Sequence, residues 1–182
     1  MLKQDSRMSV FLSSSVNTLR VVTMYTKEGS IIILGATMRC GVSESYVDNL
    51  SAGGLTVGID CITGRLNKYA MDNKGNRYVK HPKSHIVFED FIIPEWGRIV
   101  ETTEKIQKAF SFYCLLGIDI ALQESGDPIV IEVNASPDLS EEVGPLLKDK
   151  KNLKAFGEYD LLINKHQRKL YNNLNKISKN DN

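Results

Sequence analysis

The sequence has no apolar run of about 20 residues, the length that a membrane-spanning helix requires. Residues 1–16 also lack a long apolar segment, which argues against a signal peptide. Positive and negative charges nearly balance, and the net charge of +1 predicts no broad attraction to nucleic acid or to a membrane surface. We therefore expect a cytoplasmic protein that neither inserts into a membrane nor binds nucleic acid.

Cysteine is also scarce, with three residues far apart in the sequence, Cys40, Cys61 and Cys114. They form no CxxC pair, so free thiols are a simpler interpretation than a metal site or a disulfide framework. The histidines show no ligand spacing, and His81-Pro82 need not be catalytic. Nucleotide-binding loops of the GxxxxGK[ST] and GxGxxG types are absent as well.

The N-terminal part of the chain is predicted to be rich in β-strands. The length of 182 residues and the hydrophobic content of 42% suffice for one globular domain with its own core. We expect strands at residues 17–25, 31–40 and 55–59, separated by turn signals. Repeated Gly, Asn and Pro turn signals in residues 60–93 predict an irregular insertion, with a hairpin around residues 68–80.

A helix is expected after this insertion, with Pro94 in its first turn. Residues at helical spacing predict one face that packs on the sheet. That face consists of Trp96, Ile99, Val100, Thr103, Ile106, Phe110 and Tyr113. A short helix within residues 138–150 and a last helix around residues 158–177 are also expected. The first domain is thus assigned to residues 1–150, and a C-terminal helix and tail to residues 151–182.

The most informative segment is residues 117–137, GIDIALQESGDPIVIEVNASP. Two apolar runs flank a Ser-Gly-Asp-Pro turn signal, which predicts an antiparallel hairpin. Pairing about this turn places Asp119 opposite Glu132, and Asn134 shares the face of Glu132 because a strand alternates its faces. On the other face, Ile118 is expected to meet Val133, Ile120 to meet Ile131, and Leu122 to meet Ile129.

Asp119 and Glu132 would bring two negative charges together. Like charges directly opposite each other destabilise a sheet, so a cation is expected between them. Two carboxylates and the amide of Asn134 are oxygen ligands that suit Mg²⁺, with Mn²⁺ as a second choice. A surface hairpin whose acids face water is the other interpretation. Against it, Glu132 lies in a run of Ile and Val, where we expect a carboxylate to be shielded from solvent.

Two arginines, Arg20 and Arg39, interrupt apolar runs of the same predicted sheet. A guanidinium makes planar, bidentate contacts with phosphate or carboxylate. The alternative is an edge-strand arginine whose stem packs and whose head group lies in water. Gly53 and Gly54 either let the backbone approach a ligand closely or form a flexible turn, which Asn49 could cap.

Together these residues resemble the ATP-grasp ligases. An Asp-bearing strand, a hairpin and then Glu-x-Asn-x-x-Pro resembles their magnesium site, with a spacing similar to that of the D-alanine–D-alanine ligase and ribosomal-protein glutamate ligase groups. The order Asn-Thr-x-Arg, Arg, Asp-Asn-x-x-x-Gly-Gly, Ile-Pro-x-Trp and Asp…Glu-x-Asn spans residues 9–140. It most resembles the sugar-transfer-associated ATP-grasp family, sometimes labelled alpha-L-glutamate ligase-related. Pro137-Asp138 departs from the Pro-Gly of many members.

The resemblance implies an α+β fold, namely the C-terminal subdomain of an ATP-grasp domain, with a mainly antiparallel sheet packed against helices. It also implies that Asp119, Glu132 and Asn134 hold the magnesium ions that bridge the ATP phosphates. Arg20 and Arg39 would approach the terminal phosphate or an acyl-phosphate intermediate.

The implied activity is that of a Mg-ATP-dependent ligase. ATP phosphorylates a small-molecule carboxylate, and an amine or similar nucleophile then attacks the acyl phosphate. Asn49, Gly53 and Gly54 would belong to the cofactor-binding site. The family label points to polysaccharide or peptide-conjugate biosynthesis.

The N-terminal half of an ATP-grasp domain, which grips the phosphates and contacts adenine, is not recognised in the sequence. We therefore expect either a fragment of a longer ligase or a natural half that pairs with a partner chain, and the chain by itself can be inactive. The alternative is a non-catalytic ligand- or partner-binding module derived from an ATP-grasp half. A metal-dependent hydrolase is more distant, because no histidine ligands accompany the carboxylates.

Overall fold

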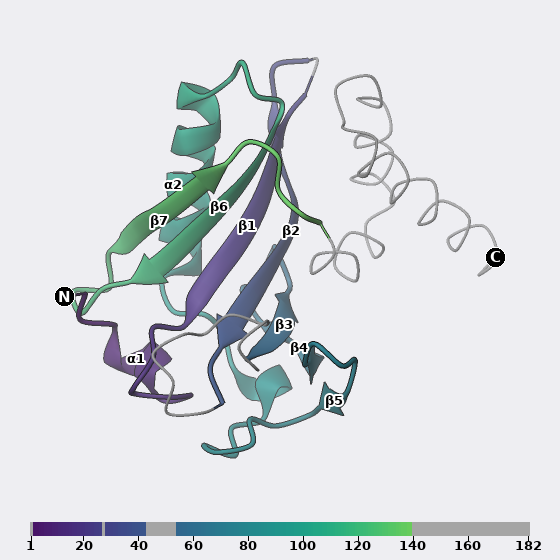
Figure 1. The fold of residues 1–182 in the computed structure, drawn as a ribbon. Coiled ribbons are helices and arrows are strands. Elements are labelled where there is room, and N and C mark those ends of the chain that lie inside the picture. The colour runs from purple at the N-terminus through teal and green to yellow at the C-terminus, as the bar shows by residue number, and fades with distance from the viewer. Residues whose placement is uncertain (1, 27, 43–53, 140–182) are drawn as a thin grey trace, which may run out of the picture.

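The fold of the computed structural model, which describes residues 2–26, 28–42 and 54–139, is built on one seven-stranded sheet (Figure 1). The strand order is β5-β4-β3-β2-β1-β6-β7, and each neighbouring pair is antiparallel. The bounds are β1 Thr18–Tyr25, β2 Ile31–Cys40, β3 Leu55–Ile59, β4 Leu66–Met71, β5 Arg77–Tyr78, β6 Leu115–Leu122 and β7 Pro128–Asn134. The α+β prediction, with a mainly antiparallel sheet, is confirmed.

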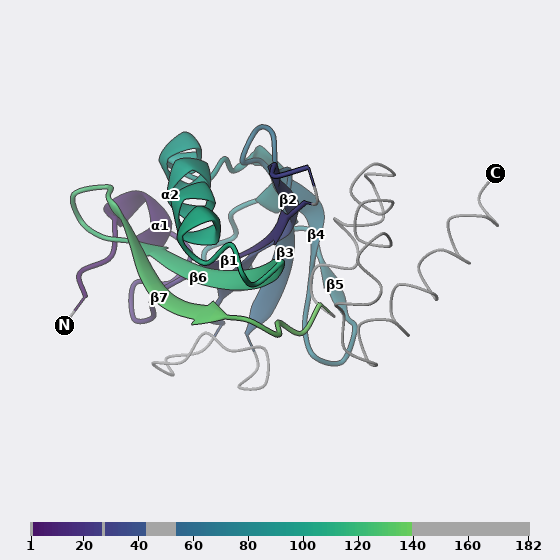
Figure 2. The same cartoon turned by 90° about the horizontal axis from the view of Figure 1, so that it is seen from above.

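Helix α2, Trp96–Ala109, lies against one face of this sheet (Figure 2). Trp96, Ile99, Thr103 and Gln107 are its buried residues, so the helix presents an apolar stripe with one amide in it. Both ends of that amide are hydrogen-bonded, because Gln107 Oε1 accepts from Thr23 Oγ1 of β1 at 2.7 Å and its Nε2 donates to the carbonyl of Tyr113 at 2.8 Å. The helix is therefore held to the sheet by apolar packing and by a buried hydrogen-bond pair.

The predicted helix is right in place but wrong at both ends. Glu95 precedes it with a left-handed φ of 54°, so the helix begins at Trp96 and Pro94 lies before its first turn. Phe110 and Tyr113 follow the last helical residue and are 41% and 45% exposed. Helical spacing places residues on one face only within the helix, so it does not apply to these two residues.

The core lies where the central strands meet α2 and the N-terminal segment. Strand β6 is buried along its whole length, whereas β7, at the edge of the sheet, is exposed over most of its length. Helix α1, Ser6–Ser9, contributes Met8, and Phe11 stacks on Phe88 with ring centroids 6.0 Å apart. The buried side chains of the core include Met8, Phe11, Leu19, Val21, Met38, Val57, Phe88, Ile99, Ile118 and Ile120.

The insertion at residues 60–93 contains the predicted hairpin, formed by β4 and β5, and the short helix η2, Phe88–Asp90. His81 connects this insertion to the end of β2. Its Nδ1 accepts from the backbone N–H of Ser84 at 3.2 Å, so its Nε2 donates to the carbonyl of Gly41 at 2.9 Å. Burial lowers the pKa of His81, and the residue is accounted for by this structural role.

Across the described parts of the chain, no helix is long and apolar enough to cross a membrane. The helix predicted around residues 158–177 lies outside the described residues, and so does the one within residues 138–150, apart from Asp138 and Leu139. The division at residue 150 remains a prediction.

Candidate functional site

Three charged residues from three neighbouring strands stand in one row on the sheet face opposite α2. Arg20 of β1 pairs in register with Asp119 of β6, and Asp119 pairs with Glu132 of β7. Paired residues of an antiparallel sheet project from the same face. Thr23, which contacts α2, is an odd number of residues from Arg20, so the row lies on the other side of the sheet.

Arg20 and Asp119 form a two-pronged, buried salt bridge. Arg20 Nε lies 2.5 Å from Asp119 Oδ1 and Nη2 lies 2.7 Å from Oδ2, and both residues are 8% exposed. Arg39 Nη1 lies 3.8 Å from Asp119 Oδ2, so a second guanidinium faces the same carboxylate. The structure thus brings both predicted arginines to the predicted acid, and the positive charge nearest to Asp119 is Arg20.

Glu132 and Asn134 come from the edge strand β7. The predicted pairing of Asp119 with Glu132 is observed, as is that of Ile118 with Val133. Glu132 is exposed, however, and the expectation that it is shielded was wrong, because a strand at the sheet edge has a neighbour on one side only. The Asn134 side chain is fixed by its own turn, since Oδ1 accepts the N–H of Ser136 at 2.9 Å.

A β-bulge changes the pairing on the turn side of Glu132. Ile120 pairs with Val130 instead of Ile131, and Leu122 pairs with Pro128 instead of Ile129, so the two apolar pairs predicted there are wrong. The register shift falls between Asp119 and Ile120, which gives β7 one extra residue at this point. The bulge leaves the pairing of Asp119 with Glu132 intact.

Gly117 is a site residue that the sequence prediction missed. It pairs with Asn134, and the chain that follows Asn134 folds back over it. A Cβ atom on Gly117 would lie 2.6 Å from Pro137 Cβ and 3.4 Å from Arg20 Cδ. Only glycine gives Pro137 this space against the sheet. A glycine in the middle of an apolar strand was the available signal, because it often marks a close backbone approach.

Gly54 is buried and directly precedes β3, which pairs with the strand of Arg39. Asn49 and Gly53 lie outside the described residues.

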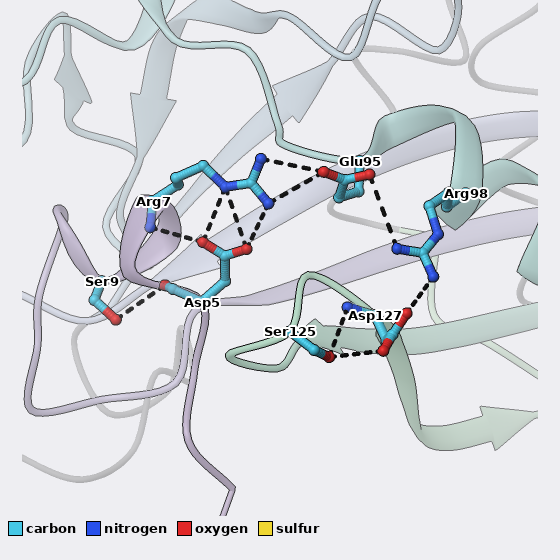
Figure 3. A network of polar contacts seen from close by, with 7 residues as sticks. All are labelled: Asp5, Arg7, Ser9, Glu95, Arg98, Ser125 and Asp127. Carbon is cyan, nitrogen blue, oxygen red and sulfur yellow. Dashed lines mark hydrogen bonds and ion pairs between the residues drawn. The ribbon is translucent and has the colours of Figure 1, made fainter.

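A chain of alternating charges fixes the turn of the β6–β7 hairpin (Figure 3). Arg7 contacts Asp5 at 2.7 Å and Glu95 at 3.1 Å, and Arg98 bridges Glu95 to Asp127 of the turn. The N-terminal segment, the start of α2 and the hairpin turn therefore meet at one point. The hydrogen bonds from Arg7 lower the pKa of Asp5, and those from Ser125 and Arg98 lower the pKa of Asp127.

The donor set on this face fits a hard cation. Within the described ranges, no group of three or more His, Cys, Asp and Glu side chains is placed so that it could hold a metal ion, so a cation here would need the Asn134 amide as its third protein ligand. Asp119, Glu132 and Asn134 offer oxygen atoms only, from two paired strands. Two carboxylates and an amide suit Mg²⁺ when phosphate oxygens and water complete the shell.

Comparison with known proteins assigns the chain to a family. The family described as sugar-transfer associated ATP-grasp matches residues 1–155 of the chain. The comparison with curated proteins and the comparison with solved structures each found no match.

Proposed function

Because the chain belongs to the sugar-transfer associated ATP-grasp family, whose domain indicates an ATP-dependent ligase type of function, we propose that the sheet face opposite α2 is the magnesium and phosphate site of such a ligase. The observation that carries the proposal is the row formed by Arg20, Asp119 and Glu132 on paired strands. A row of this kind, buried at Arg20 and Asp119 and exposed at Glu132, joins oxygen ligands for a metal to a guanidinium for a phosphoryl group.

The proposed reaction joins a carboxylate to an amine in two steps. A carboxylate oxygen of the acid substrate attacks the terminal phosphorus of ATP, and ADP leaves. The amine nitrogen then attacks the acyl carbon, phosphate leaves, and the nitrogen loses a proton. The product is an amide, and polysaccharide or peptide-conjugate biosynthesis is the proposed setting.

The oxygen ligands and the arginines of this face have different proposed roles. Glu132, Asp119 and Asn134 would hold Mg²⁺, which neutralises the phosphate charge when it is bound. Arg20 already positions Asp119, and its guanidinium can share charge with a phosphoryl oxygen on the same face. Arg39 stands beside Asp119 and would stabilise charge on the transferred group.

The proposal includes a second ATP-grasp half that completes the nucleotide site, in the same polypeptide or in a partner chain. The reason is geometric, since the assembled site residues all come from one sheet and face the same way. The small-molecule carboxylate and amine would enter between the two halves.

A metal titration tests the site directly. Mn²⁺, which gives a paramagnetic signal, is titrated into the full chain and into Glu132→Gln, with Glu124→Gln as the matched control. Glu124 is an exposed acid of the same hairpin whose partner is Lys3, away from the row. We expect Glu132→Gln to weaken Mn²⁺ binding by about tenfold or more, since even outer-shell partners contribute 10–100-fold.

Glu124→Gln should bind Mn²⁺ as the unmodified chain does. Equal Mn²⁺ affinity of Glu132→Gln and the unmodified chain would show that the metal site has been assigned to the wrong residues. In the complete enzyme, ATP-dependent ligation should be lost in Glu132→Gln and kept in Glu124→Gln.

A further inference from the structure

Thr56 of β3 carries a buried hydroxyl that has no hydrogen-bond partner. The residue is 7% exposed, and its Oγ1 is closed to solvent. Among the residues that the structure describes, three other buried side-chain oxygens share this property, on Ser15, Asn17 and Ser84, and of these four residues Thr56 is the one that belongs to a strand of the sheet. A buried donor without an acceptor costs free energy, so its retention calls for an explanation.

The register places this hydroxyl on the face of the proposed site. Thr56 pairs with Arg39 of β2, and Arg39 pairs with Thr18 of β1. Thr18 is two residues from Arg20, so all of these side chains project from the same side of the sheet. Thr56 and Arg39 thus form a second row, directly beside the row of Arg20 and Asp119.

The chemistry of the second row favours an oxyanion. The Arg39 guanidinium donates several N–H groups in a plane, and the Thr56 hydroxyl adds one donor. A cation would face two guanidiniums here, those of Arg39 and Arg20, which opposes its binding. A phosphate or carboxylate group bound beside this register pair would accept from Arg39 and supply the acceptor that Thr56 lacks.

We propose that Arg39 and Thr56 together bind an oxyanion group during the ligase reaction, which makes Thr56 a substrate-binding residue. This inference rests on the proposed function for the surrounding site. The oxyanion is either the carboxylate of the acid substrate or the terminal phosphate of ATP. The Thr56 hydroxyl oxygen is closed to solvent, so binding of the oxyanion requires side chains on this face to rearrange. Arg39, which pairs with Thr56 in register, is the side chain that we expect to move.

Inorganic phosphate is the probe for a first test, titrated into the full chain in the presence of Mg²⁺ and followed by calorimetry. The variants are Thr56→Val, which removes the hydroxyl and keeps the shape, and Thr56→Ser, which keeps the hydroxyl. Ser84→Ala is the matched control, since it removes a buried, unpartnered hydroxyl from the insertion, outside the strands of the sheet. The melting temperature of each variant is measured alongside.

We expect Thr56→Val to weaken phosphate binding by about tenfold, the effect of one hydrogen bond to a charged group. Thr56→Ser and Ser84→Ala should bind phosphate as the unmodified chain does. The melting temperature of Thr56→Val should stay the same or rise, because an unpaired hydroxyl is removed. Unchanged phosphate affinity in Thr56→Val, or no phosphate binding by the unmodified chain, would overturn the inference. A lower melting temperature of Thr56→Val would do so too, because the hydroxyl would then have a partner in the protein.

Further binding measurements distinguish the two possible oxyanions, and they also separate this inference from the proposed metal site. A larger loss of affinity for a non-hydrolysable ATP analogue than for ADP in Thr56→Val assigns the terminal phosphate. If Thr56→Val loses the same affinity for the ATP analogue as for ADP, and binds acetate more weakly than the unmodified chain does, the oxyanion is the carboxylate of the acid substrate. Mn²⁺ binding reports on Glu132 and should be unaffected by Thr56→Val, so failure of the metal site and failure of the oxyanion site give different results.

Discussion

Arg20 and Asp119 are 99 residues apart in the sequence and form a two-pronged salt bridge across β1 and β6, with N–O distances of 2.5 and 2.7 Å. The pair occupies the place where the sequence predicts a metal ligand. Arg20 thus supplies a positive charge next to Asp119, and a divalent cation would either share this carboxylate with Arg20 or take over part of it.

Removal of the Arg20 guanidinium should lower the free energy of unfolding, because Asp119 is buried. Arg20→Met removes both close hydrogen bonds to the buried Asp119 carboxylate and leaves Arg39, at 3.8 Å, as its ion-pair partner, so we expect the free energy of unfolding to fall by up to about 3–5 kcal/mol. Urea unfolding measures the change. Arg98→Met, which breaks an exposed ion pair with Asp127, is the control and should cost much less.

Mg²⁺ should partly restore the stability of the Arg20→Met variant if Asp119 is a metal ligand. Adding Mg²⁺ is expected to raise the melting temperature of this variant more than that of the unmodified chain, because the ion replaces the missing positive charge. An equal response of the two proteins to Mg²⁺ would speak against Asp119 as a metal ligand.

Gly117 should tolerate no side chain. In Gly117→Ala the new Cβ atom would lie 2.6 Å from Pro137 Cβ, so the segment after Asn134 has to move. Overpacking of this kind costs about 1–3 kcal/mol, and Mn²⁺ affinity should fall together with stability. Gly97→Ala is the control, because nothing lies within 4 Å of its Cβ position and alanine favours a helix. A Gly117→Ala chain as stable as Gly97→Ala would contradict the close packing of Pro137.

Acid should destabilise the contact between the insertion and β2 through His81. Burial lowers the pKa of His81 in the folded state, so the unfolded chain binds the proton more readily. The contribution of neutral His81 is complete above its unfolded pKa of about 6.5 and is lost as the pH falls through the lower folded pKa. We expect the melting temperature to fall as the pH drops below about 6.5. In His81→Gln, the plot of melting temperature against pH should be flatter in this range. A curve of the same shape in His81→Gln would assign the drop to other groups.

The charge chain around Arg7 should support the hairpin through electrostatics that salt can screen. Asp127→Asn weakens the attraction between the turn and Arg98, so the melting temperature should fall at low salt. The difference from the unmodified chain should shrink in 1 M salt, where the screening length is about 3 Å. If the difference persists in high salt, the side chain acts through packing or hydrogen bonds instead.

Local patterns were sufficient to predict most elements near the site. The alternation of apolar residues around the Ser-Gly-Asp-Pro turn predicted β6 and β7 and the pairing of Asp119 with Glu132, because a strand has a fixed period of two. The same rule failed beyond Glu132, where the bulge adds one residue to β7. A bulge is a feature of the paired strands, and the apolar alternation of one strand alone does not show it.

The sequence by itself determined the fold class, the strands and the family, since these depend on short-range periodicity and on the order of motifs. Only the tertiary structure decided that Arg20 closes on Asp119, that Gly117 leaves space for Pro137, and that Thr56 stands beside Arg39. It also decided that Glu132 is exposed, because the position of a strand within the sheet is set by long-range pairing. A sequence pattern indicates the face of a strand on which a residue lies. The burial of that residue and the side chains that it contacts depend on which strands pair in the assembled sheet.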